Sequence, residues 1–300
     1  MNTFNLLFIF GTGLLIIVAF WWVRRRSSLQ GDQVSTAKAA IAACSTMLDL
    51  VSHIQQHRGM STAFLAGDQS FARRLANKRM EIEPMLAQLQ QIALAEYAYN
   101  YPCFTPNDVH LWRHRWGMLV QELNGYTVEK SIAAHSNLIA MLLNWLGSVG
   151  EARIELPLSS VLPDGAVRNF SHRLPQLTET LGQARATGSG VAAQGICSAV
   201  ARVRLMFLVS RAESLVDQAC AVDPQGAVAA QKVKTLAMTI RTHMLATQQV
   251  NVSAEEYFAE ATRAIDAVFA WGRDCGRALD AQVVQVATGY KPPVAMQSGK

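Results

Sequence analysis

The sequence predicts an all-α protein: one N-terminal transmembrane helix followed by about eight helices that form two four-helix bundles, either sequential or interleaved. After residue 33, apolar residues recur every three to four positions, the spacing of one buried helix face. Gly, Pro and Asn cluster at the breaks between these segments. Short β-branched runs such as Val283-Val284 lie inside the helical period, so no segment favours a sheet. The chain has 300 residues, half of them apolar, which is enough for a sizeable core.

Residues 4–23 form an apolar run without a charged side chain. A helix needs about 20 apolar residues to span a bilayer. Three consecutive arginines, residues 24–26, follow at once, whereas no Lys or Arg precedes the run. This order is the reverse of a signal peptide, and the positive-inside rule places everything after residue 26 in the cytoplasm. We therefore expect a single-pass protein of the inner (cytoplasmic) membrane, with residues 1–32 as anchor and basic connector.

The periodic segments predict helices over residues 33–66, 70–97, 108–123, 127–150, 166–187, 190–220, 225–250 and 254–287. Asn107 is the expected cap of the third helix, and Ser253 with Glu256 has the spacing of a capping box before the last. Residues 156–165 contain two prolines and are the main linker candidate. They divide a sensor region, residues 33–287, into halves of residues 33–151 and 164–287, and residues 288–300 are expected to be a loose tail.

Composition and motifs exclude several functions. The chain has 27 Lys and Arg against 22 Asp and Glu, and without residues 24–26 the basic count falls to 24, so nucleic-acid binding has little support. The five cysteines are dispersed without metal-ligand spacing, which favours buried thiols in a reducing compartment and no metal or cofactor. Glycine-rich phosphate loops, GxSxG and HExxH are lacking, so we expect no enzyme activity.

The most informative feature is a polar interruption at the end of the first predicted soluble helix. One inward seam passes through Ile41, Cys44, Leu48 and Val51 and then reaches Gln55, Arg58 and Thr62. A neighbouring seam passes through Met47, Leu50 and Ile54 and then reaches His57, Ser61 and Phe64. Burying an unpaired guanidinium is costly, so some group must accept the hydrogen bonds of Arg58. Gly59, beside it, lets backbone or ligand approach closely.

A second interruption falls at Arg185, four residues after the inward Leu181, and the small residues 186–190 that follow are interpreted as a helix end. Arg204 and Arg211 are expected to be solvated flank residues, and His135 a satisfied core or rim histidine rather than a ligand. Two guanidinium groups that converge inside a bundle would make a pocket for a small planar oxyanion, because each fork offers paired donors to coplanar oxygens.

Both interruptions resemble a known family. Residues 50–65 resemble the signature of the NIT family, the nitrate- and nitrite-sensing domain of bacterial receptors and regulators; they read Leu50-Val-Ser-His53-Ile-Gln55-Gln-His57-Arg58-Gly59-Met60-Ser61-Thr-Ala-Phe64-Leu65. Residues 174–188, from Leu174 through Arg185 to Gly188, resemble its second recurrent block. The resemblance implies an all-α sensor of paired four-helix bundles that binds nitrate or nitrite through buried arginines.

Carried over by position in the motifs, Arg58 and Arg185 are the expected anion ligands. Gln55, His57 and Ser61 of the first motif complete the set, although His57 stands where the family commonly has an acidic or second basic residue. Arg241 is added on its position in the second half alone. No output signature follows the eighth helix, so a separate signalling protein is the expected partner. A homodimer through a long helix such as residues 254–287 stays open.

An alternative of a different class is a membrane-tethered scaffold or assembly factor without a small-molecule ligand, whose buried arginines form salt bridges with Glu122, Glu179 or Glu213. In that case each buried arginine has an acidic partner, whereas a sensor brings at least two arginines together with too few carboxylates. Bicarbonate or a carboxylate would also suit two guanidinium forks. If the halves fold as strictly sequential bundles with Arg58 and Arg185 far apart, a shared site is ruled out and interleaved bundles would be required.

Overall fold

The computed structural model describes the backbone of residues 3–246 and 249–288, and side chains in residues 31–246 and 249–286. The described chain is helical, with one isolated β-bridge between Ile196 and Gln249 and no named strand. The α-helices are α1 (Thr3–Leu65), α2 (Phe71–Tyr97), α3 (Pro106–Glu122), α4 (Val128–Val149), α5 (Leu156–Leu158), α6 (Ala166–Arg168), α7 (Leu174–Gln194), α8 (Ala199–Val222), α9 (Ala227–Ile240) and α10 (Ala254–Thr288). Three π-helical segments extend them, η2 (Gly150–Glu155), η3 (Asn169–Arg173) and η5 (Arg241–Leu245), and the 3-10 turns are η1 (Leu123–Gly125) and η4 (Pro224–Gly226).

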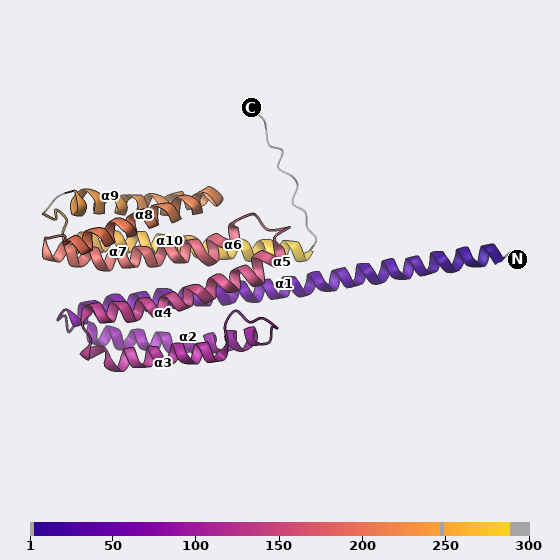
Figure 1. Cartoon of the computed structure of the whole chain (residues 1–300), viewed down its shortest axis with the longest axis horizontal. Coiled ribbons are helices and arrows are strands. Elements are labelled where there is room, and N and C mark those ends of the chain that lie inside the picture. Colours follow the sequence, from indigo (N-terminus) through magenta and orange to yellow (C-terminus); the bar gives the residue numbers. More distant parts are fainter. Residues whose placement is uncertain (1–2, 247–248, 289–300) are drawn as a thin grey trace, which may run out of the picture.

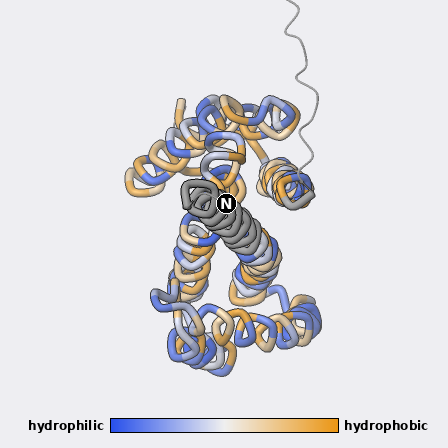
Figure 2. The backbone as a smooth tube through the Cα atoms, turned by 90° about the vertical axis from the view of Figure 1, so that its right-hand side faces the viewer, coloured by the Kyte–Doolittle hydropathy of each residue, from blue (hydrophilic) through white to orange (hydrophobic). Residues whose placement is uncertain are grey.

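The helices form two bundles that follow one another in the sequence. Helices α1 to α4 make the first bundle and α7 to α10 the second, with their long axes side by side (Figure 1). Figure 2 looks along the helices and shows the two groups one above the other. The prediction of an all-α protein with two four-helix bundles is thus confirmed, and the bundles are sequential. Helix α1 nevertheless contacts α10 and α7 of the second bundle as well as its own neighbours.

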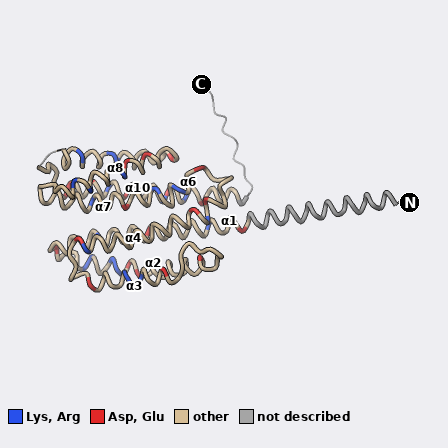
Figure 3. The backbone as a smooth tube through the Cα atoms, in the orientation of Figure 1, with Lys and Arg blue, Asp and Glu red and all other residues tan. Residues whose placement is uncertain are grey.

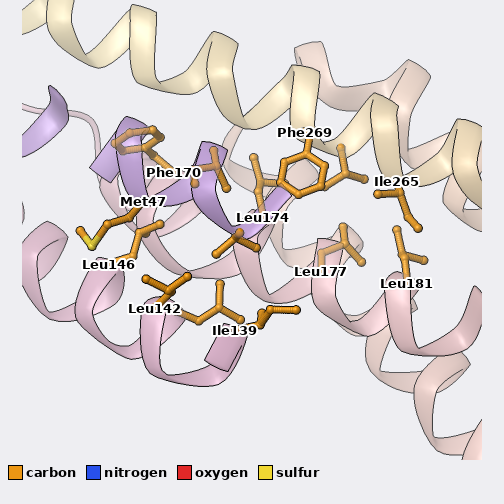
Figure 4. Close-up of a cluster of buried hydrophobic side chains, with 14 of the residues drawn as sticks. Met47, Ile139, Leu142, Leu146, Phe170, Leu174, Leu177, Leu181, Ile265 and Phe269 are labelled. Carbon is orange, nitrogen blue, oxygen red and sulfur yellow. The ribbon is translucent and has the colours of Figure 1, made fainter. Parts of the chain in front are cut away.

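A continuous apolar core joins the two bundles. Met47 of α1 and three residues of α4 face α7 and α10 across the junction, and all these side chains are buried (Figure 4). The cluster consists of Met47, Ile139, Leu142, Leu146, Phe170, Leu174, Leu177, Leu181, Ile265 and Phe269. Burial of this apolar surface holds the bundles together and fixes α1 against α7. Two residues far apart in the sequence, one in each half, can therefore share a site although the bundles are sequential.

The predicted helix end at residues 186–190 is wrong. Helix α7 runs on to Gln194 and ends at Gly195, which has a φ of 69° in the left-handed region that favours glycine. A Cβ at Gly188 would collide with the ring of Tyr257, whose hydroxyl donates to the Ala184 carbonyl at 2.7 Å. The small residues therefore allow α10 to approach α7 closely, and α8 begins only at Ala199, where Ser198 is the cap.

Other boundaries also differ from the prediction. Thr105 caps α3 in place of Asn107, because Asp108 and Thr105 form a capping box around a proline at the first helical position. Most of the predicted linker, residues 156–165, is a turn, and it is flanked by the π-helical segments η2 and η3. The helix predicted to end at residue 250 ends with η5, at residue 245.

The predicted connector at residues 27–32 is also helical, since α1 is continuous from Thr3 to Leu65. The side chains of the predicted membrane span, residues 4–23, lie outside those that the structure describes. Among the described residues, 31–65 and 128–158 are long and apolar enough to cross a membrane. Both segments contribute to the core of the first bundle, which accounts for their apolar character.

Candidate functional site

Of the polar residues that end the inward seams of α1, all but the partly buried Thr62 are buried, as predicted. Gln55 and Arg58 are each 2% exposed, and His57 and Ser61 are completely covered. Neighbouring positions on a helix point about 100° apart, so His57 and Arg58 meet different partners. Arg58 faces α7 in the second bundle, whereas His57 stays inside the first bundle, against α3 and α4.

Arg58 is held by a carboxylate on α7. Its Nη1 donates to Oε1 of Glu179 at 2.7 Å and its Nη2 to Oε2 at 3.1 Å, and Nη1 also donates to Oγ of Ser136 at 2.8 Å. Glu179 accepts two further hydrogen bonds, from Nε2 of Gln55 at 3.0 Å and from Nε2 of Gln183 at 2.9 Å. The guanidinium and the carboxylate thus face each other as two parallel forks, the geometry of strong ion pairs.

Arg185 lies on the same helix as Glu179, but its contacts are different. Its Nη1 donates to Oγ1 of Thr262 at 3.0 Å, and the guanidinium stands 4.9 Å from the ring centre of Phe258, both on α10. Among the described residues no carboxylate oxygen lies within 4.0 Å of it. Burial, and next the positive charge of Arg58, lower the pKa of Arg185 to about 10. The structure thus holds a partly buried cation without an acidic partner.

Arg58 of α1 and Arg185 of α7 each lie beside a glycine of the other helix. A Cβ on Gly182 of α7 would lie 2.6 Å from Nη2 of Arg58, so a side chain there would displace the guanidinium. A Cβ on Gly59 of α1 would lie 3.7 Å from Nη2 of Arg185, an ordinary contact. Two guanidinium groups and the carboxylate of Glu179 therefore share this junction, and these three groups carry one net positive charge. The carboxylate of Asp266 acts on Arg185 through its charge, without an ion pair to it.

His57 pairs with the histidine that the sequence assigned to the core. Its Nδ1 lies 2.8 Å from Nε2 of His135, whose Nδ1 lies 2.7 Å from the carbonyl oxygen of Ser131. Because Nδ1 of His135 must donate to that carbonyl, its Nε2 accepts from His57, and Nε2 of His57 accepts from Nε of Arg79 at 3.4 Å. Ser61 contacts the same ring, with Oγ 3.3 Å from Nδ1. Both imidazoles are satisfied within the first bundle.

Burial keeps this pair neutral. It lowers the pKa of His57 to about 2, with His135 as the next cause, and that of His135 to about 4. The structure thus brings Gln55, Arg58 and Arg185 together but places His57 and Ser61 on another side of α1.

Arg241, which was assigned on position alone, is not brought to this cluster. It is exposed at the start of η5 and forms an ion pair with Glu213 of α8, with Nη2 2.6 Å from Oε2. Arg204 is also exposed, as expected for a flank residue. Figure 3 shows acidic and basic positions interspersed along the helices of both bundles, in line with the nearly balanced charge.

Four contacts of the cluster were not predicted: Ser136, Gln183, Phe258 and Thr262. Gln183 could have been found, since it lies one turn after Glu179 on the same helix. A pocket of about 150 Å³ adjoins the ion pair between α4, α7 and α8 and is lined in part by Ser136, Glu179, Gln183 and Arg211. Arg211, also expected to be a plain flank residue, is exposed to solvent but borders this pocket.

The fold and the cluster define a helical-bundle protein in which two arginines and one glutamate meet at the junction of the bundles. A family model described as nitrate and nitrite sensing (NIT) matches residues 49–284, which include both arginines. The chain belongs to the NIT family. This description concerns sensing and agrees with the expectation that the chain is no enzyme.

A solved structure, that of the NasR transcription antiterminator, shares the fold. It is 20% identical, with a TM-score of 0.65 over 91% of this chain and 74% of that chain. No curated protein matches the chain.

Proposed function

We propose that this chain is a membrane-anchored sensor that binds nitrate or nitrite between Arg58 of α1 and Arg185 of α7. One observation carries the proposal: two guanidinium groups meet at the bundle junction with a single carboxylate at hydrogen-bonding distance. The family to which the chain belongs supports the choice of anion. A monovalent anion would offset part of the positive charge of the two arginines, which favours binding in a buried place.

The contacts of the cluster combine features of both hypotheses from the sequence. Arg58 has an internal acidic partner, as the scaffold hypothesis expects, and so does the exposed Arg241. Arg185 lacks such a partner among the described residues, and Thr262 supplies only a neutral acceptor. A purely structural arginine would be expected to have its charge neutralised when it is buried. The unbalanced charge of Arg185 therefore favours the sensor.

The proposed signal passes through α1. An anion that bridges α1 and α7 shifts the population between two packings of the bundles only if it contacts both helices in one packing better than in the other. Because α1 is continuous from Thr3 to Leu65, a displacement at Arg58 would be carried to the end of the predicted span at residue 23, roughly 50 Å away at 1.5 Å per residue. A separate protein that receives the signal remains a prediction, and so does a homodimer of this chain.

Calorimetric titration of the full chain in detergent micelles tests the anion site. Nitrate and nitrite are expected to release heat with saturation, whereas chloride is not, and bicarbonate and acetate test the specificity for other planar oxyanions. Arg185→Ala should weaken nitrate binding at least tenfold. Arg185→Lys should restore only part of the lost affinity, because a lysine ammonium lacks the planar fork of a guanidinium. The matched control is Arg241→Ala, which should bind as the unchanged chain does. Lack of binding by the unchanged chain, or unchanged affinity in Arg185→Ala, would refute the site.

Fractionation tests the anchor. The full chain should sediment with membranes and remain there after extraction at alkaline pH, whereas a chain that starts at residue 31 should be released. Retention of the shortened chain would mean that the predicted span at residues 4–23 does not anchor the protein.

A further inference from the structure

The carboxylate of Glu179 occupies the position on Arg58 that a planar oxyanion would need. Its two oxygens lie 2.7 and 3.1 Å from the two terminal nitrogens of one guanidinium, so that fork is already filled. Gln55 and Gln183 donate to the same two oxygens. Nitrate, nitrite and a carboxylate all present a pair of coplanar oxygens to such donors. An anion that binds Arg58 through this fork must therefore compete with Glu179.

We propose that Glu179 is an internal competitor that the bound oxyanion displaces from Arg58, and that the displaced carboxylate pairs with Arg211 of α8. This inference rests on the proposed anion site. Displacement leaves the two arginines facing the anion and frees Nε2 of Gln55, which is 2% exposed, to donate to it. Without a new partner, the buried carboxylate would oppose the exchange, since an unpaired buried charge is costly.

Arg211 is placed to supply that partner. Glu179 and Arg211 line the same pocket of about 150 Å³, which lies between α4, α7 and α8. Arg211 now donates through Nη2 to Oε1 of Gln176 at 3.2 Å, and no ion pair involves it among the described residues. A turn of the Glu179 side chain into the pocket would exchange one arginine partner for another, with no proton taken up or released.

The exchange would couple the anion to the packing of α7 against α8. In the empty site Glu179 joins α7 to α1, and in the occupied site it would join α7 to α8. Such a side chain with two alternative partners is the kind of bistable element through which a small ligand changes helix packing.

Nitrate titrations of four variants of the full chain test the inference. Glu179→Gln keeps the shape but removes the charge that holds Arg58, and it should bind nitrate about tenfold more tightly. Arg211→Ala removes the new partner and should bind about tenfold more weakly. In the double variant the loss of Arg211 should have no further effect, because no carboxylate remains to be accommodated. Arg204→Ala removes another exposed arginine from α8 and is the matched control, expected to bind as the unchanged chain does.

The double variant distinguishes displacement from a general effect of charge. If Arg211 acted only through its field or touched the anion directly, Arg211→Ala would weaken binding equally with Glu179 and with Gln at position 179, and the inference would be wrong. If Glu179→Gln bound nitrate no more tightly than the unchanged chain, the inference would also be overturned. The proposed function would still stand in that case, provided that the unchanged chain binds nitrate. If neither chain bound nitrate or nitrite, both proposals would fail. Should Glu179→Gln not fold, Arg211→Ala alone decides, since unchanged affinity there overturns the exchange.

Discussion

The buried pair of Arg58 and Glu179 allows a quantitative prediction about stability. Arg58→Ala leaves a carboxylate whose side chain is 8% exposed, with Gln55 and Gln183 as its remaining donors. Breaking a buried ion pair in this way costs roughly 3–5 kcal/mol, because the remaining charge is uncompensated. For a domain of this size, 1 kcal/mol corresponds to about 2–4 °C in Tm, so the melting temperature should fall by about 6–20 °C.

Replacing both partners gives the internal check. A chain with Arg58→Met and Glu179→Leu buries no unpaired charge, so it should recover most of the loss, as apolar replacements of buried pairs often do. Arg241→Ala breaks an ion pair whose arginine side chain is 51% exposed, and it should cost less than about 1 kcal/mol. Thermal unfolding of the full chain in micelles, followed by circular dichroism, measures all three. A loss below about 1 kcal/mol in Arg58→Ala, or a double variant less stable than Arg58→Ala, would refute the reasoning.

Two further predictions concern the helices around the cluster. Gly182→Ala should destabilise the protein by about 1–3 kcal/mol and weaken nitrate binding, because the new Cβ would occupy the place of the Arg58 guanidinium and move this anion ligand out of the site. Gly59→Ala makes an ordinary contact and should be neutral or stabilising by up to about 1 kcal/mol. Unfolding and titration of both variants check this, and equal losses would contradict it. The free energy of unfolding should also fall between pH 7 and pH 5. In the folded chain His57 and His135 have pKa values of about 2 and about 4, so they bind no proton in this range. In the unfolded chain both imidazoles bind a proton below about pH 6.5, which favours unfolding. The loss is about 2 kcal/mol per imidazole, and replacing both by apolar residues should flatten the dependence, whereas replacing the exposed histidines of α3 should not.

Periodicity located the helices of this fold and the inward positions on them. The seam through Ile41, Leu48 and Val51 is buried, and so is the polar continuation at Gln55 and Arg58. The same reasoning gave a wrong helix boundary where a small residue allows two helices to pack closely and does not end a helix. Gly188 suggests a helix end in the sequence, yet it lies inside α7 because the ring of Tyr257 needs the space of a missing side chain. Such a contact joins two distant segments and leaves no local pattern.

The candidate site was predictable only in part for a related reason. Arg58 and Arg185 stand out because each is polar where the helical pattern calls for an apolar residue, but the pattern does not say what each one meets. Glu179 lies 121 residues from Arg58 in the sequence, and only the packing of α7 on α1 pairs them. His57 shows most clearly that the pattern does not reveal the partner of a buried polar residue. It directly precedes Arg58, but neighbouring positions on a helix point about 100° apart, and His57 therefore contacts His135 in the first bundle.

The bundles are sequential and yet Arg58 and Arg185 lie at one junction, and the reason bears on how such a sensor would work. Helix α1 belongs to the first bundle by sequence, but one of its faces lies against α7 and α10 of the second. A site on that face contacts both bundles, and Arg58 of α1 reaches α7 of the second bundle through Glu179. Glu179 makes this connection in the empty site. If an anion takes over from Glu179, the same two helices remain joined through a different set of charges, so the response consists of a change in packing rather than of separation. Arg185, which forms no ion pair with a described carboxylate, would make the exchange selective for an anion, since a neutral ligand would not interact with its charge.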